Sequence, residues 1–139
     1  MEAQAILQPV FVMALLSLVM LLWMYATRFP AMSKAGIEPQ DAADTDQLKK
    51  LPAEAVRVAD NYNHLFEQPT VFYAVAVSIA VLGQVDALHV QCAWAYAGLR
   101  ILHSLVQATV NLVPLRFALF SLSWIALAIM IVRGALEVF

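Results

Sequence analysis

A predominantly apolar run of 22 residues, from Ile6 to Thr27, is the feature that most restricts how this chain can fold. As an α-helix the run would be about 33 Å long, enough to cross the roughly 30 Å hydrocarbon core of a bilayer. The residues before it include Glu2 and no lysine or arginine, whereas a signal peptide begins with basic residues. We therefore expect this run to be a retained transmembrane helix.

The composition of the whole chain agrees with a membrane protein. Hydrophobic residues make up 63% of the 139 residues and charged residues only 13%, and the mean hydropathy is +0.76. A soluble domain of this size would need more polar surface, so we expect one integral membrane domain covering residues 1–139. The net charge of -2 does not suggest a nucleic-acid partner. The single cysteine, Cys92, excludes an internal disulfide and a cysteine-based metal cluster.

Polar residues and prolines divide the chain into four apolar segments. The predicted transmembrane helices cover residues 6–27, 53–83, 87–111 and 115–138. The last two connections are short, which makes neighbouring helices antiparallel. The fold class predicted is therefore all-α, a membrane-embedded four-helix bundle with up-and-down topology. The one long connection, residues 28–52, is rich in polar and helix-breaking residues, and we expect it to be a solvent-exposed loop.

The basic residues indicate how the bundle is oriented. An even number of crossings places both chain ends on one side of the membrane. Arg133 lies toward that side, and Arg100 lies inside the third helix. The other six basic residues lie toward the side of the long loop: Arg28, Lys34, Lys49, Lys50, Arg57 and Arg116. Because cytoplasmic loops carry an excess of lysine and arginine, we expect the loop to be cytoplasmic and the termini to lie outside the cytoplasm.

Polar side chains follow helical spacing in the cytoplasmic half of the second segment. Arg57, Asn61 and His64 lie at i, i+4 and i+7, which places them on one face of a helix. Asp60, His64 and Glu67 form an adjacent row. Pro69 interrupts this segment, because proline lacks an N–H and clashes with the carbonyl four residues earlier. We expect a kink there that separates the polar half of the helix from the apolar half.

The third and fourth segments supply polar groups at the same depth. Arg100, His103 and Gln107 share one face of the third segment, and Arg116 opens the fourth. A charged side chain near the bilayer centre costs about 2.5–3.5 kcal/mol on insertion scales. We therefore expect Arg100 and Glu67 to face the bundle interior and to pair with each other. Two interpretations follow: a purely structural ion pair, or an intramembrane site for a polar ligand, which we favour. The spacing of histidines and carboxylates predicts no metal site.

Particular stretches of this chain resemble the MAPEG family, the membrane-associated proteins of eicosanoid and glutathione metabolism. These stretches are "RVADN" in the second segment, "LRILH" in the third and "PLR" at the start of the fourth. The resemblance extends over nearly the whole chain. It implies a trimer of four-helix subunits with glutathione as co-substrate at the subunit interfaces. The activities it implies are glutathione transfer and glutathione-dependent peroxide reduction, on lipophilic electrophiles that enter from the lipid.

The resemblance also implies roles for individual residues. Arg116 would be catalytic and stabilise the glutathione thiolate, and Arg100 would bind a glutathione carboxylate. The other residues implied to hold glutathione are Arg57, Asn61, Asn63, His64, Glu67, His103 and Gln107. Two assignments remain open: Asn61 or Asn63 matches the family asparagine, and His64 or Glu67 takes the position of the family glutamate. Gln107 stands where the synthases of the family have a tyrosine.

A second class of function is compatible with the same residues. Some members of the family bind lipids or partner proteins without catalysing a reaction, so the alternative is a lipid-binding scaffold or an accessory subunit of a larger membrane complex. Binding of glutathione by the purified protein distinguishes the two. From the brevity of the chain and the lack of a targeting signal, we expect a protein of the bacterial inner membrane.

Overall fold

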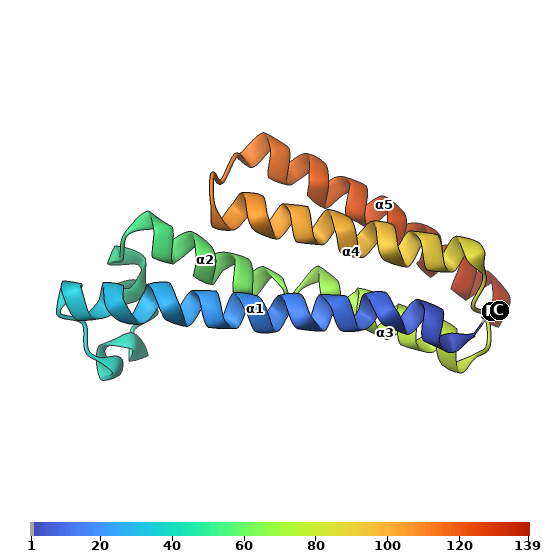
Figure 1. The fold of residues 1–139 in the computed structure, drawn as a ribbon, viewed down its shortest axis with the longest axis horizontal. Coiled ribbons are helices and arrows are strands. Elements are labelled where there is room, and N and C mark those ends of the chain that lie inside the picture. The colour runs from blue at the N-terminus through green and yellow to red at the C-terminus, as the bar shows by residue number, and fades with distance from the viewer. Residues whose placement is uncertain (1) are drawn as a thin grey trace.

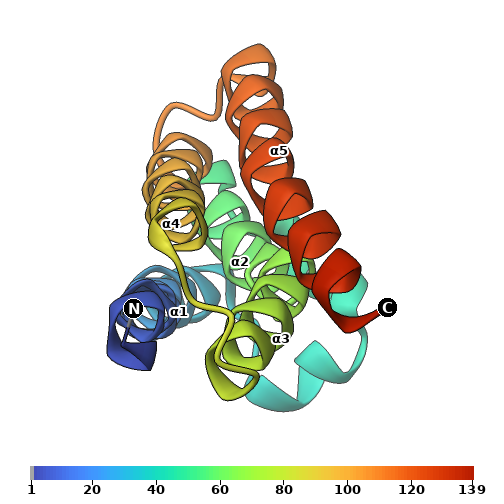
Figure 2. The same ribbon diagram turned by 90° about the vertical axis from the view of Figure 1, so that its right-hand side faces the viewer.

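The computed structural model describes residues 2–139 and confirms an all-α fold, with no strand within that range. Its α-helices are α1 (Ala3–Ala35), α2 (Ala53–His64), α3 (Gln68–Val81), α4 (Ala87–Ala108) and α5 (Val113–Val138). Figure 1 shows α2 and α3 following one another alongside α1, with the α4–α5 hairpin beside them. The start of α1 and the end of α5 lie at the same end of the molecule (Figures 1 and 2).

The first helix is longer than the sequence predicts. α1 continues through Pro30 and ends at Ala35, where Gly36 adopts the left-handed conformation with a φ of 69°. The N–H of Ile37 then bonds the carbonyl of Met32 at 3.0 Å, which closes the helix end as glycine typically allows. At about 50 Å, α1 exceeds the thickness of the hydrocarbon core. Part of the segment 28–52 is therefore helix rather than loop.

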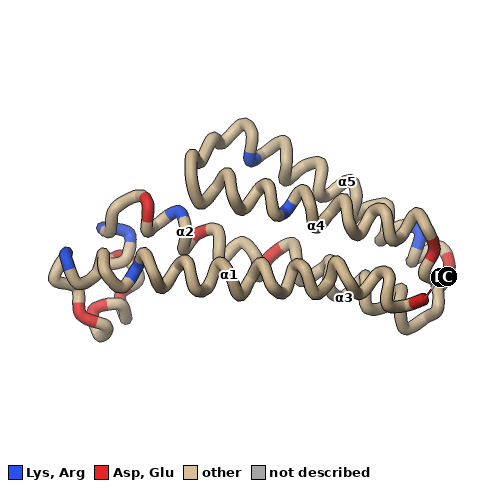
Figure 3. Tube along the Cα trace, in the orientation of Figure 1, with Lys and Arg blue, Asp and Glu red and all other residues tan. Residues whose placement is uncertain are grey.

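The remainder of that segment folds into two short 3₁₀-helices, Pro39–Ala43 and Thr45–Lys50. Asp44 begins the second of them by accepting a hydrogen bond from the N–H of Asp46 at 3.1 Å. A small apolar cluster of Met32, Leu51 and Ala55 holds this region against the ends of α1 and α2. Charged residues gather toward the two ends of the long axis and are sparse between them, as expected of a membrane protein (Figure 3).

The predicted second helix, residues 53–83, is two helices in the structure. α2 ends at His64 and α3 begins at Gln68, with Pro69 in the first turn of α3. Between them Glu67 has φ -99° and ψ -101°, which is not helical. The kink expected at Pro69 is thus a complete break: the proline ring clashes with the carbonyl of Leu65, and the helix ends there instead of bending. The break lies beside the candidate site.

Each helix buries one side in a shared core. α1 packs against α2, α3 and α4, while α5 packs mainly on α4 and also touches α3 (Figure 2). The core contains Ile6, Met13 and Met20 of α1, Phe72 of α3 and Leu127 of α5, each at most 1% exposed. Phe72 stacks on Tyr96 of α4 with ring centroids 4.3 Å apart.

Two helices, α1 and α5, are long and apolar enough to cross a membrane among the described residues. Their outward sides are apolar, with side chains such as Phe11, Leu22 and Ile125 each more than half exposed. The four crossings expected from the sequence remain a prediction for the rest of the bundle, since α2 and α3 are individually short and α4 carries a buried polar face.

Candidate functional site

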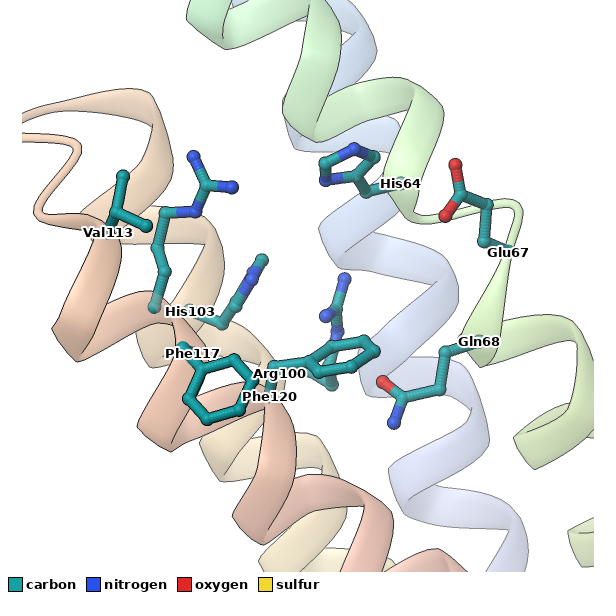
Figure 4. Close-up of a pocket in the computed structure, with 9 residues that line it drawn as sticks. His64, Glu67, Gln68, Arg100, His103, Val113, Phe117 and Phe120 are labelled. Atoms are coloured by element: carbon teal, nitrogen blue, oxygen red, sulfur yellow. The ribbon is translucent and has the colours of Figure 1, made fainter.

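A cavity of about 270 Å³ opens beside the α2–α3 break, between this break, α4 and the first half of α5. Its volume is near the lower end of the roughly 300–1,000 Å³ usual for ligand pockets. Figure 4 shows side chains from all three regions converging on this space. The lining residues are His64, Glu67, Gln68, Arg100, His103, Val113, Arg116, Phe117 and Phe120.

The polar face predicted on the third segment is buried in α4. Arg100 is 1% exposed, His103 4% and Gln107 2%. The Nε and Nη2 atoms of Arg100 and the Nδ1 atom of His103 have no hydrogen-bond partner within residues 2–139. A buried polar group without a partner is costly. Two such groups bordering a cavity therefore indicate a place for a polar ligand.

The predicted row on α2 faces the C-terminal half of α4. The Nδ1 atom of His64 is 3.2 Å from Oε1 of Gln107, and Nε of Arg57 donates to the carbonyl of Ala108 at 3.4 Å. Asn61 is completely buried, and both atoms of its amide lack a partner within the described range. Of this row, His64 lines the cavity directly.

Other predicted residues lie elsewhere. Asn63 is exposed and borders a different hollow, together with Arg28 and Asp60. Glu67 lines the cavity but is also exposed. The ion pair expected between Arg100 and Glu67 is not formed among residues 2–139. The non-helical backbone at Glu67 separates its side chain from the face of α2 that packs on α4.

Arg116 reaches the cavity from the first turns of α5, which begins at Val113 with Pro114 in its first turn. Nη1 of Arg116 donates a hydrogen bond to Oδ1 of Asn111 in the connection between α4 and α5. This contact leaves the Nε atom of Arg116 buried without a partner among the described residues. The helix N-terminus adds a partial positive charge on the same side of the cavity.

Several residues of the site were not predicted. Gln68 lies at the inner end of the cavity and is 6% exposed, and it follows the break whose position the sequence indicated only as a kink. Phe117 and Phe120 supply an apolar wall, and Phe120 lies near the His103 ring, with centroids 6.3 Å apart. The position of Phe120, four residues after Arg116 on one helix, was an available signal, since residues three to four apart share a face.

The cavity combines two guanidinium groups, two imidazoles, the exposed carboxylate of Glu67, the carboxamide of Gln68 and an apolar wall. Arginine stays charged at all physiological pH values and grips carboxylates with two parallel hydrogen bonds. The arrangement can thus hold an anionic ligand next to an apolar one. Within residues 2–139 no group of three His, Cys, Asp or Glu side chains is placed to hold a metal ion.

Comparison with models of known protein families gives one result that covers most of the chain. The model described as the MAPEG family matches residues 6–136. No curated protein and no solved structure matches the chain. The match includes every residue that lines the cavity.

Proposed function

The chain belongs to the MAPEG family, and from this membership together with the cavity we propose that it is a membrane-bound glutathione transferase or glutathione-dependent peroxidase. Members of the family include glutathione transferases and generally use glutathione. The acceptor would be a lipophilic electrophile. The apolar wall of the cavity supports this acceptor class, because Phe117 is 69% exposed on a helix that is apolar enough to contact lipid.

The observation that carries the proposal is the pair of arginines without acidic partners at one cavity. Arg100 is buried and forms no ion pair within residues 2–139, and Arg116 bonds only the neutral amide of Asn111. Glutathione carries two carboxylates, and its reactive form carries a thiolate. We assign a carboxylate to Arg100 and the thiolate to Arg116. Of the remaining predicted residues, His64, Glu67 and His103 line the cavity and are assigned to the peptide part, and Gln107 supports His64 from behind.

The chemistry expected of the chain is activation of the thiol. A free thiol has a pKa of about 8.5, and an adjacent arginine and a helix N-terminus favour the thiolate. In transfer, the thiol releases its proton and the sulfur forms a bond to the electrophilic carbon, while the bond from that carbon to its leaving group breaks and the electron pair departs with the leaving group. In peroxide reduction, the sulfur attacks one oxygen and the O–O bond breaks to release an alcohol. A second glutathione then displaces water from the resulting sulfenic acid to give the disulfide.

Assembly as a homotrimer belongs to the same proposal. The cavity is open to one side, and its polar groups would meet hydrocarbon if nothing covered them, at a cost of several kcal/mol for each charge. A neighbouring copy that covers the opening removes this cost. We further propose the bacterial inner membrane as the location, with the segment 28–52 in the cytoplasm, because six of the eight basic residues lie toward that side.

A calorimetric titration of glutathione into the detergent-solubilised protein tests the proposal. The wild type should bind. Arg100→Gln should raise the Kd about tenfold or more, since hydrogen bonds to charged groups contribute about 1.5–3 kcal/mol. Lys34→Ala is the matched control, because it removes an exposed cation at the far end of α1 and should leave the Kd unchanged. No heat of binding in the wild type would refute the proposal and favour a scaffold or accessory subunit.

A further inference from the structure

A hydrogen-bonded network closes the inner end of the cavity and joins three helices. Nε2 of Gln68 on α3 donates to Oγ of Ser123 on α5 at 3.2 Å. The hydroxyl of Tyr96 on α4 donates to Oε1 of Gln68 at 3.3 Å. The hydroxyl of Ser123 donates in turn to the carbonyl of Phe120 at 2.7 Å. Gln68 is 6% exposed, and Tyr96 and Ser123 are fully buried.

Two residues of the network lie on the same helix faces as the two arginines of the cavity. On α5, Ser123 lies seven residues after Arg116, which places it about 10 Å further along the same face. On α4, Tyr96 lies four residues before Arg100, also on the same face. The network therefore lies one to two helical turns from the arginines along α4 and α5.

α5 is joined to the α2–α3 break by this network. It packs mainly on α4, its contact with α3 is smaller, and most of its side chains are exposed. Among residues 2–139, one other side-chain hydrogen bond or ion pair joins α5 to a preceding helix or loop beyond the α4–α5 connection, and it lies at the opposite end of α5. There Arg133 donates to both carboxylate oxygens of Asp86 at 2.9 and 2.6 Å. Within the described part of the chain, the contact between Gln68 and Ser123 is thus the polar link between the first half of α5, which carries Arg116, and the break region.

We propose that Gln68 is a positioning residue: through Ser123 it fixes the rotation and tilt of the first half of α5, and so holds Arg116 over the cavity. Its consequence for thiol activation rests on the proposed function above, whereas its effect on α5 does not. Gln68 suits this task because its carboxamide donates and accepts at once, so a single side chain satisfies both the serine and the tyrosine. In apolar surroundings neither hydroxyl can replace that partner with water.

Two variants remove the network from opposite sides. Ser123→Ala deletes the attachment on α5. Gln68→Met keeps the length of the side chain and deletes its hydrogen bonds. Ser121→Ala is the matched control, because Ser121 lies on the same helix and its hydroxyl makes no hydrogen bond within residues 2–139. Tyr96→Phe retains the stacking on Phe72 and the Gln68–Ser123 bond, so it should have a smaller effect than either test variant.

Hydrogen exchange followed by mass spectrometry, without ligand, reports on α5 directly. We expect faster exchange over residues 113–120 in Ser123→Ala and Gln68→Met, and wild-type exchange in Ser121→Ala. Wild-type exchange in both test variants would overturn the proposal. The experiment contains no glutathione. It therefore tests the positioning of α5 even if the protein turns out not to bind glutathione.

A second readout tests the link to Arg116. The thiolate absorbance of bound glutathione should titrate in both test variants with an apparent pKa raised by about half a unit, a roughly threefold loss of thiolate at neutral pH. Ser121→Ala should titrate as the wild type does. Faster exchange over residues 113–120 with an unchanged thiol pKa would refute the positioning of Arg116, because α5 would then have moved without consequence for the site.

Discussion

Replacing Arg100 with methionine should make the unliganded protein more stable while weakening its stabilisation by glutathione. Arg100 is 1% exposed and forms no ion pair within residues 2–139, and two of its guanidinium nitrogens lack a partner. Methionine has a similar length, is uncharged and fills irregular space well. The change therefore removes a desolvated charge without leaving a large cavity.

The magnitude follows from the surroundings of the guanidinium. A fully buried ion is destabilising by several kcal/mol even after relaxation. Arg100 also borders a cavity of about 270 Å³ that is open to one side, and this reduces the penalty. We expect a gain of about 1–3 kcal/mol for Arg100→Met, within the range seen when buried charges are replaced by apolar side chains. For a chain of this size each kcal/mol raises the Tm by about 3–6 °C.

Thermal unfolding in detergent, with and without glutathione, is the assay. Glutathione at one hundred times the wild-type Kd should stabilise the wild type by about 2.7 kcal/mol, and a Kd raised tenfold or more should reduce this stabilisation to about 1.4 kcal/mol or less in Arg100→Met. Arg133→Met is the comparison, because Arg133 is paired with Asp86 and its replacement should lower the Tm. A lower Tm for unliganded Arg100→Met would refute the reasoning, since it would mean that the buried guanidinium already has a stabilising partner.

Three further predictions concern charge, topology and assembly. Arg133 and the N–H of His89 hold the pKa of Asp86 well below its usual range. The ionised carboxylate should therefore stabilise the protein above about pH 4, and this stabilisation should be lost as the pH falls toward the lowered pKa. Asp86→Asn should weaken the decline of Tm in acid, and an unchanged decline would contradict this prediction. In a Cys92→Ala background, a cysteine that replaces exposed Ala43 should resist a membrane-impermeant thiol reagent in intact cells, whereas a cysteine that replaces Gln4 should react. The reverse pattern would mean that the segment 28–52 lies outside the cytoplasm. Native mass spectrometry in mild detergent should show three copies, and a stable monomer would contradict the shared cavity.

Much of the fold could be predicted because its determinants are local. Apolar length identified the long helices, and helical spacing placed Arg100, His103 and Gln107 on one buried face. The sequence also indicated a disturbance at Pro69. Its extent could not be predicted, because a proline within a helix can bend it or end it, and packing against α1 and α4 decides between the two. The same limit applies to α1, which passes through Pro30.

The site was predicted in part for a related reason. Residues on regular helices were grouped correctly, as the contact between His64 and Gln107 shows. Glu67 was assigned to a row that assumes an unbroken helix, so its pairing with Arg100 was wrong. Ser123 sits in a strongly apolar helix and gave no signal, because its role depends on which side chain of another helix it meets. Such contacts between distant segments follow from packing and cannot be derived from spacing along one helix.

The measurement that tests the account most directly is the ionisation of glutathione bound to Arg116→Ala. The thiolate absorbance is followed as a function of pH in the wild type, in Arg116→Ala and in Arg116→Lys, each shown by mass measurement to have the same assembly. We expect the apparent thiol pKa to lie below about 8.5 in the wild type and to be raised in Arg116→Ala, with Arg116→Lys intermediate because it keeps the charge without the planar fork. Identical titrations in the wild type and in Arg116→Ala would contradict the account, since Arg116 would then have no part in activating the thiol.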